Sequence, residues 1–128
     1  MFKYYQTQFI MLINLTNHPS VRWSDKQKAA AEEYGEIVDM SFPQVEASAD
    51  EQFVKSLAKE YLEKIKKIVD DNPVVVHVMG EMTFTYSLVS LLKSEGIVCV
   101  ASTSERIVNE FENGKKEVVF QFNRFRRY

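Results

Sequence analysis

Polar side chains follow three apolar runs of the sequence, each at the point where a buried strand should end. The three segments are residues 16–20, 80–85 and 102–106. Because parallel strands end at the same edge of a sheet, where open α/β folds bind ligands, we expect these segments to lie close together. Their amides, hydroxyls, carboxylate, arginine and histidine suit phosphates and hydroxylated sugars. The candidate ligand-binding residues are Thr16, Asn17, Gly80, Glu81, Met82, Thr83, Thr85, Ser102, Thr103, Ser104 and Arg106.

The middle segment carries the strongest prediction. Residues 74–79 are almost all apolar, which is typical of a strand buried on both faces. The helix that follows Gly80 and Glu81 begins with hydroxyl residues, so its free backbone N–H groups should favour an anion, above all a phosphate. Glu81 complicates this prediction, because a carboxylate repels phosphate unless it points away, accepts a ribose hydroxyl or pairs with Arg106.

Each of these residues also has a plainer interpretation. Gly80 can serve only to let the backbone turn. Thr83 or Thr85 can be the N-cap of the helix, and Glu81 can be a solvated carboxylate that complements the helix dipole. Residues 102–104 can cap a following turn.

The two histidines lead to different predictions. His18 lies where a strand should end, so it has either a functional role or only a capping and packing role beside Pro19. His77 lies inside an apolar strand and is expected to be a hydrogen-bonded core residue. Trp23 and Phe42 could stack on a base, but we expect buried packing for both.

Several chemistries have no motif in this sequence. It contains no G-x-x-x-x-G-K-[ST] and no G-x-G-x-x-G, so neither a P-loop NTPase nor a dinucleotide fingerprint is present. It contains neither a G-x-S-x-G elbow nor a clustered His, Asp and Glu spacing for a metal. A reaction without metal, or binding without reaction, remains, and we expect no cofactor.

Composition favours one folded domain. The 128 residues are 45% hydrophobic and 27% charged, and the formal net charge of −2 provides no basic field for duplex DNA. Cys99, the single cysteine, should be a buried thiol, so no disulfide framework is expected. No run approaches the roughly 20 apolar residues of a membrane helix. We therefore expect a cytoplasmic protein without membrane contact. Residues 1–8 form a possible leader extension, and Met11 could be the natural start.

The order of apolar and polar runs predicts an α/β fold. Strands are expected at residues 9–15, 36–39, 74–79 and 97–101, and helices at 24–34, 48–69 and 83–95. Ser24 and Ser48 each begin a capping box. Asn113-Gly114 predicts an antiparallel hairpin between residues 107–112 and 116–125. The prediction is a single small Rossmann-like domain over residues 1–128, with a mainly parallel sheet, helices on both faces and a C-terminal β-hairpin.

The motif order resembles small CRISPR-associated Rossmann-like proteins, the stand-alone CARF-like and ring-nuclease families. The resemblance rests on four segments that cover most of the chain in order: Leu15-Thr16-Asn17-His18-Pro19-Ser20, Val78-Met79-Gly80-Glu81-Met82-Thr83, Cys99-Val100-Ala101-Ser102-Thr103-Ser104-Glu105-Arg106 and Phe120-Gln121-Phe122-Asn123-Arg124-Phe125-Arg126-Arg127-Tyr128. Larger members often have Gly-Gly and Lys beside the helix start, where this chain has Gly80-Glu81 and Thr83.

The resemblance implies that the ligand is a cyclic oligoadenylate, the second messenger of type III CRISPR defence. It implies a homodimer, because a symmetric ring would straddle a two-fold axis. It also implies cleavage without metal, in which a ribose 2′-hydroxyl attacks the neighbouring phosphorus and leaves a 2′,3′-cyclic phosphate. His18 would be the general acid or base. Two alternatives stay open: a binding module that sequesters or senses the ring, and an α/β interaction domain without a nucleotide site.

Overall fold

The computed structural model describes residues 8–128, and residues 1–7 of the expected leader lie outside the described part. Five strands form one sheet in the order β2-β1-β3-β4-β5. The first four strands of this order are parallel, and β5 pairs antiparallel with β4. The strands are β1 (Met11–Thr16), β2 (Glu36–Asp39), β3 (Val74–Met79), β4 (Val98–Glu110) and β5 (Lys116–Arg127). This arrangement confirms the predicted α/β fold, which is compatible with a small Rossmann-like domain.

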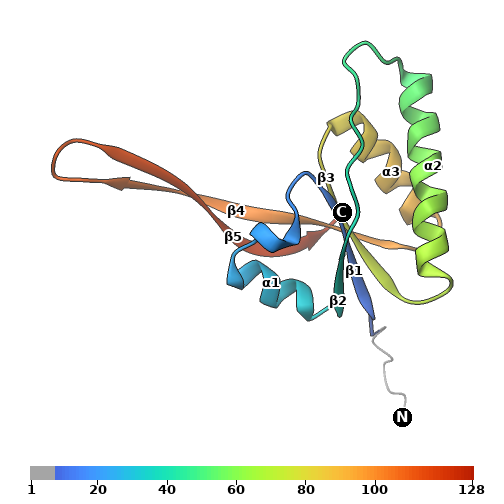
Figure 1. Cartoon of the computed structure of the whole chain (residues 1–128), viewed down its shortest axis with the longest axis horizontal. Helices are drawn as coiled ribbons and strands as arrows, with labels where there is room; N and C mark the ends of the chain where they lie inside the picture. The colour runs from blue at the N-terminus through green and yellow to red at the C-terminus, as the bar shows by residue number, and fades with distance from the viewer. Residues whose placement is uncertain (1–7) are drawn as a thin grey trace.

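Helices cover both faces of the sheet, as predicted (Figure 1). They are the short η1 (Ser20–Arg22), α1 (Asp25–Glu32), α2 (Glu51–Val69) and α3 (Met82–Ser94). The first predicted cap is confirmed, because the Ser24 hydroxyl accepts a hydrogen bond from the Gln27 amide. The second prediction was wrong by two residues. Asp50 rather than Ser48 caps α2, since its carboxylate accepts the Phe53 amide at 2.9 Å.

Two hydrophobic clusters hold these layers together. The larger one packs α2 and α3 against the sheet, and Ile65, Phe84 and Leu88 are among its fully buried members. The smaller one packs α1 against the opposite face, where Trp23 and Phe125 join Leu12. Cys99 belongs to the larger cluster, and burial raises the pKa of its thiol to about 12. The expected buried thiol is thereby confirmed.

The fourth predicted strand is much longer than expected. Residues 102–106 were predicted as a polar loop, but they lie within β4, which continues to Glu110. The reason is the hairpin, because β5 pairs with β4 from Val100 to Glu110 and satisfies the backbone of this polar stretch. Gly114, with a φ of 83°, provides the turn that Asn113-Gly114 predicted.

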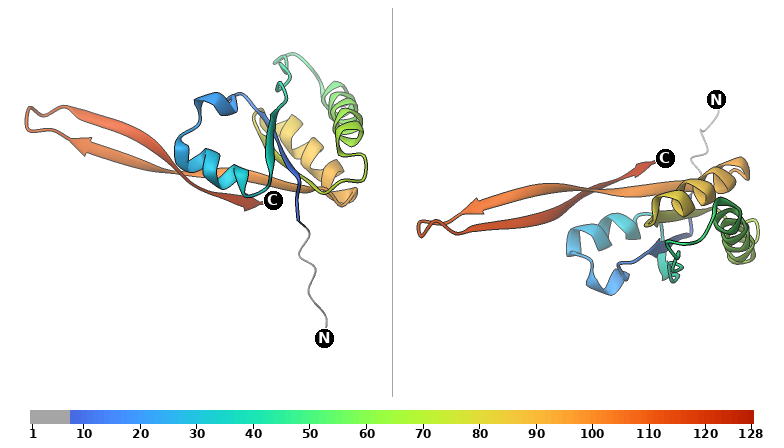
Figure 2. Two further views of the ribbon diagram at one scale, coloured as in Figure 1. Left: turned by 60° about the horizontal axis from the view of Figure 1, so that its bottom comes forward. Right: turned by 90° about the horizontal axis from the view of Figure 1, so that it is seen from above.

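The far part of this hairpin forms an arm, here residues 105–121, that extends past the other strands and the helices (Figures 1 and 2). A register shift at Thr103 and Ser104 lies where the arm begins. Such a shift leaves an extra residue on one strand and increases the local twist.

None of the helices within residues 8–128 has the length and apolar character that a membrane span requires.

Candidate functional site

A cavity of about 970 Å³ lies between α1, the ends of β1 and β3, and the β4–β5 hairpin. It is at the edge of the sheet where the sequence placed the site, since Thr16 and Met79 end their strands there. Six predicted site residues line this cavity together: Thr16, Asn17, His18, Gly80, Ser102 and Ser104.

A chain of three polar side chains forms the buried wall of the cavity. His77 is only 2% exposed, and its Nδ1 lies 3.0 Å from Asn14 Oδ1. Its Nε2 lies 3.2 Å from the Ser102 hydroxyl. Adjacent strands produce this row, because Asn14 pairs with His77 and His77 with Val100, two residues before Ser102. Alternation along a strand then directs all three side chains to the α1 face.

The hydrogen bonds that Asn14 donates determine which nitrogen of His77 carries the proton. The Asn14 amide donates to Asp39 Oδ1 at 2.8 Å and to the His18 carbonyl at 2.9 Å. Its oxygen therefore faces His77 and accepts a hydrogen bond from Nδ1–H. This assignment leaves Nε2 as an acceptor for the Ser102 hydroxyl, whose oxygen also lies 3.1 Å from a second acceptor, Met79 Sδ.

Burial, followed by the nearby charge of His18, lowers the pKa of His77 to about 4. The imidazole is therefore neutral near pH 7. The prediction that His77 is a hydrogen-bonded core residue is confirmed, but its contact with a cavity residue was not foreseen.

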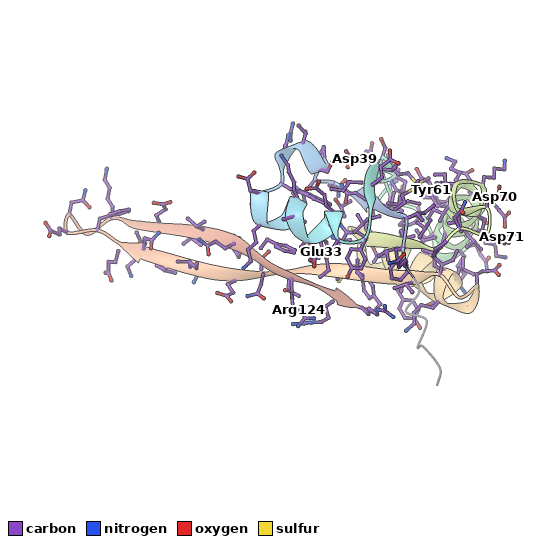
Figure 3. The ribbon with its side chains drawn as sticks, turned by 90° about the horizontal axis from the view of Figure 1, so that it is seen from below. Glu33, Asp39, Tyr61, Asp70, Asp71 and Arg124 are labelled. Atoms are coloured by element: carbon purple, nitrogen blue, oxygen red, sulfur yellow. The ribbon has the colours of Figure 1, made fainter. Side chains whose placement is uncertain are left out.

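Asp39 fixes the loop that carries His18. Its carboxylate accepts hydrogen bonds from the Ser20 amide and hydroxyl as well as from Asn14. Burial raises the pKa of Asp39, but these hydrogen bonds outweigh burial and hold it below its ordinary value. Figure 3 shows Asp39 on the α1 side of the sheet. Trp23 adds a further tie, since its Nε1 donates to the His18 carbonyl.

Positive charge and one exposed aromatic ring characterise the rest of the lining. Arg22 and Lys26 contribute cations, and no described residue of the lining is an aspartate or glutamate. Phe120 is 68% exposed and offers a ring surface. Trp23 is buried against His77 and Phe125, as expected. The cavity can therefore accept an anion that also carries an aromatic base.

The start of α3 differs from the prediction. Glu81, not Thr83 or Thr85, is its N-cap, and the Glu81 carboxylate accepts the Phe84 amide at 2.7 Å and the Thr83 hydroxyl at 2.7 Å. The hydrogen bond from the Phe84 amide, followed by that from Thr83, lowers the pKa of Glu81. A carboxylate of the chain itself thus occupies the terminus that was expected to be free for phosphate.

The remaining predicted site residues lie outside the cavity lining, and their ligand roles stay predictions: Glu81, Met82, Thr83, Thr85, Thr103 and Arg106. The Thr103 hydroxyl donates to the Arg124 carbonyl, and Arg124 projects from the face opposite α1 (Figure 3). Arg106 lies in the arm opposite Phe120. Thr85 is buried, and its hydroxyl has no partner among residues 8–128.

Gly80 has a packing role in addition to its place at the cavity. A Cβ atom at this position would lie 2.2 Å from the Phe42 ring. Phe42 in turn packs edge-on against Phe84 on the α2–α3 side of the sheet. Gly80 is therefore required for space beside Phe42, whereas the interpretation that it lets the backbone turn stays a prediction; Phe42 is half-buried and packs against the larger cluster.

A larger cavity of about 1280 Å³ lies at the opposite end of the strands. Asp70 and Asp71, which follow α2, belong to its lining together with Glu33, all three labelled in Figure 3, and with Glu95. Open α/β sheets bind ligands beyond the carboxyl ends of their strands, and this cavity lies at the amino ends. Its four carboxylates outnumber its two cations, Lys66 and Arg127, so the smaller cavity is the better candidate for an anionic ligand.

Sequence reasoning missed the partnership of Asn14, His77 and Ser102, and also Arg22, Lys26 and Phe120. One signal was available, because Asn14 and His77 each interrupt an otherwise apolar strand. A polar residue inside a buried strand requires a partner. The register that makes these residues partners is a property of the folded sheet.

The family model for the uncharacterized protein MJ1673 family matches residues 10–126, and the chain therefore belongs to this family. A search among curated proteins found no match. The matched range contains every residue that lines the smaller cavity, so the candidate site lies within the part that defines the family.

The buried His77 predicts a loss of stability in mild acid. The unfolded chain binds a proton near the ordinary pKa of 6.5, whereas the folded chain does so only near 4. The free energy of unfolding should therefore fall as pH decreases from about 6.5 to about 4, by about 3 kcal/mol in total. Urea unfolding at pH 7, 6, 5 and 4.5 measures this loss. His77→Gln should flatten the pH dependence in this window, and an equally steep loss in that variant would contradict the assignment.

Proposed function

We propose that this member of the MJ1673 family binds a cyclic oligoadenylate, the second messenger of type III CRISPR defence, and cleaves it without metal. The observation that carries the proposal is the cavity between α1 and the hairpin, where two histidines and two cations meet without a carboxylate in the lining. The motif resemblance supplies the ligand class. The same proposal places the protein in the cytoplasm, where the messenger acts.

The lining suits each part of such a ligand. Arg22 and Lys26 can hold phosphate oxygens, because charge-assisted hydrogen bonds are stronger than neutral ones. The exposed Phe120 ring can stack on an adenine, which contributes about 1–3 kcal/mol per base in other proteins. Asn17 and Ser104 can bond ribose hydroxyls.

Cleavage would proceed by attack of a ribose 2′-hydroxyl on the adjacent phosphorus. This reaction needs a bent backbone, a proton acceptor for the 2′-oxygen, a proton donor for the leaving 5′-oxygen, and charge that stabilises the phosphorane. His18 lies in the cavity and would serve as the general acid. Arg22 and Lys26 would stabilise the phosphorane.

The arm supports the proposed homodimer. On the face that also carries Ser104, it exposes Val108, Val118 and Phe120, which are 44%, 45% and 68% exposed. A two-stranded ribbon with an apolar face is only marginally stable in water, so a covering surface is expected. A second copy related by a two-fold axis would provide it and would match the symmetry of the ring.

Sequestration of the ring without cleavage is the second candidate function. The observation in its favour is Glu81, which occupies the α3 terminus where larger relatives of the resembled families often have Gly-Gly and Lys. Such a chain would hold the ring through the cavity cations. It would lack one of the groups that bend the phosphodiester backbone of the ring.

Cleavage is tested by incubating the purified chain with radiolabelled cyclic tetra- and hexaadenylate in EDTA. We expect linear products with 2′,3′-cyclic phosphate ends. His18→Ala should lower kcat by roughly 10²- to 10⁴-fold, the range for loss of general acid–base catalysis, while the ring still binds. Gln52→Ala, an exposed residue on α2, is the control. Tight binding of a ring that stays intact would favour sequestration. If the ring does not bind, an interaction domain without a nucleotide site is the remaining function.

The position of the phosphate is tested by two lysines of the same helix. Lys26 lines the cavity and Lys28 does not. Lys26→Ala should weaken ring binding about tenfold, which corresponds to about 1.4 kcal/mol, and the effect should shrink at high salt. Isothermal titration calorimetry measures both affinities. Equal affinities for Lys26→Ala and Lys28→Ala would place the phosphate elsewhere.

The proposed role of the arm predicts the oligomeric state. The double variant Val108→Lys, Val118→Lys should sediment as a monomer, because two charges would be buried unpaired at the interface. Tyr86→Lys is the control, since Tyr86 is also a large exposed side chain, 76% exposed, but lies on α3. Sedimentation velocity compares the three proteins. A wild-type monomer at all concentrations, or a dimer that survives the arm substitutions, would overturn this role.

A further inference from the structure

We propose that Ser102 is a catalytic residue of the ring-cleaving reaction, and that it passes the proton of the attacking ribose hydroxyl to the buried His77, which Asn14 holds in place. This inference rests on the proposed function and adds the proton acceptor that His18 alone cannot supply. Its basis is the row Ser102–His77–Asn14, with contacts of 3.2 Å and 3.0 Å.

Ser102 is the most exposed member of this row, although His77 also borders the cavity. His77 is 2% exposed, and its Nε2 faces the Ser102 hydroxyl. Ser102 is half-buried and lines the cavity at the end of the parallel part of the sheet. A proton that leaves a ligand in the cavity can therefore reach His77 through the Ser102 oxygen.

The hydrogen bonds of Asn14 give the relay its direction. Because the Asn14 NH₂ group donates to Asp39 and to the His18 carbonyl, the Asn14 oxygen accepts a hydrogen bond from His77 Nδ1–H. Nε2 then has a free lone pair for the serine proton. His77 and Asn14 are thus positioning residues. A phosphate anion bound in the cavity would stabilise the imidazolium that forms.

The step balances in protons and bonds. The 2′-oxygen forms a bond to phosphorus while the bond from phosphorus to the 5′-oxygen breaks. The 2′-hydroxyl proton passes to Ser102 Oγ as the serine proton passes to His77 Nε2. The 5′-oxygen takes a proton from His18, the general acid. The products are a 2′,3′-cyclic phosphate and a 5′-hydroxyl, and water then returns the proton from His77 to His18.

The same row resembles the nucleophile, base and orienting group of serine hydrolases, but its surroundings favour a relay. Acyl transfer needs backbone amides directed at the developing oxyanion. The Ser102 amide instead points at Met79 Sδ, 3.2 Å away, and the Phe84 amide at the α3 terminus is bound to Glu81. Ser102 is therefore assigned to proton transfer and not to covalent catalysis.

Two measurements on the full chain test the relay. At saturating cyclic tetraadenylate, Ser102→Ala should lower kcat roughly 10²- to 10³-fold, with the dissociation constant of the ring changed less than about threefold. Ser102→Thr, which keeps the hydroxyl on a strand residue, should recover most of kcat. Ser90→Ala, on the exposed side of α3, is the control for serine removal. In addition, ¹⁵N NMR of the histidine rings in the free protein should show the His77 proton on Nδ1, and Ser102→Ala should shift the Nε2 resonance.

The outcomes separate the relay from the proposed function. A wild-type chain that cleaves the ring, with Ser102→Ala equally active, would overturn the relay and leave the function. A His77 proton on Nε2 would overturn the relay whatever the kinetics. A wild-type chain that leaves the ring intact would overturn the cleavage reaction, and the proposed proton step with it.

Discussion

The candidate site depends on the hydrogen bonds of the Asn14 side chain. Its amide donates to Asp39 and to the His18 carbonyl, and its oxygen faces the Thr16 hydroxyl and His77. One buried residue, 1% exposed, thereby connects β1 to β2, to β3 and to the loop that carries His18. Each of these polar groups would be costly to bury alone, because an unpaired buried donor or acceptor loses its hydration without compensation.

This contact also explains the electrostatics of the site. It orients His77 in the middle of an apolar layer, where burial keeps the imidazole neutral near pH 7. It also holds Asp39, the nearby carboxylate, in hydrogen bonds to Ser20 and Asn14. The one acidic side chain of this network thus serves the loop, while Arg22 and Lys26 determine the charge of the cavity lining. An anionic ligand is the consequence that the geometry supports best.

Local sequence patterns predicted most of the fold. The Ser24 cap, the strand at Glu36–Asp39 and the turn at Gly114 follow from side-chain chemistry within a few residues, and all are confirmed. The patterns failed where pairing between strands determines the secondary structure. The polarity of residues 102–106 indicated a loop, but pairing with β5 holds them in a strand. By contrast, the plainer interpretation of Glu81 as a solvated or helix-dipole carboxylate is confirmed, because this exposed side chain caps α3.

The sequence indicated where the candidate cavity lies but not which residues line it. Three polar segments, expected at strand ends, indicated the edge of the sheet where the cavity lies, and residues such as His18 and Ser104 line it. The partnership of His77 and Ser102 depends on strand register and order, which no segment encodes alone. Phe120 joins the cavity only because the hairpin folds back beside α1. Residues far apart in sequence thus share the site for topological reasons.

The central claim is that a cyclic oligoadenylate occupies the cavity between α1 and the hairpin. Backbone amide NMR of the ¹⁵N-labelled full chain, titrated with cyclic tetra- and hexaadenylate, tests it most directly. The account predicts that the largest shift changes fall on Asn17, Lys26, Ser104 and Phe120. Shift changes confined to the cavity that contains Asp70 and Glu95 would contradict it. So would the absence of shift changes at millimolar concentrations of the cyclic oligoadenylate.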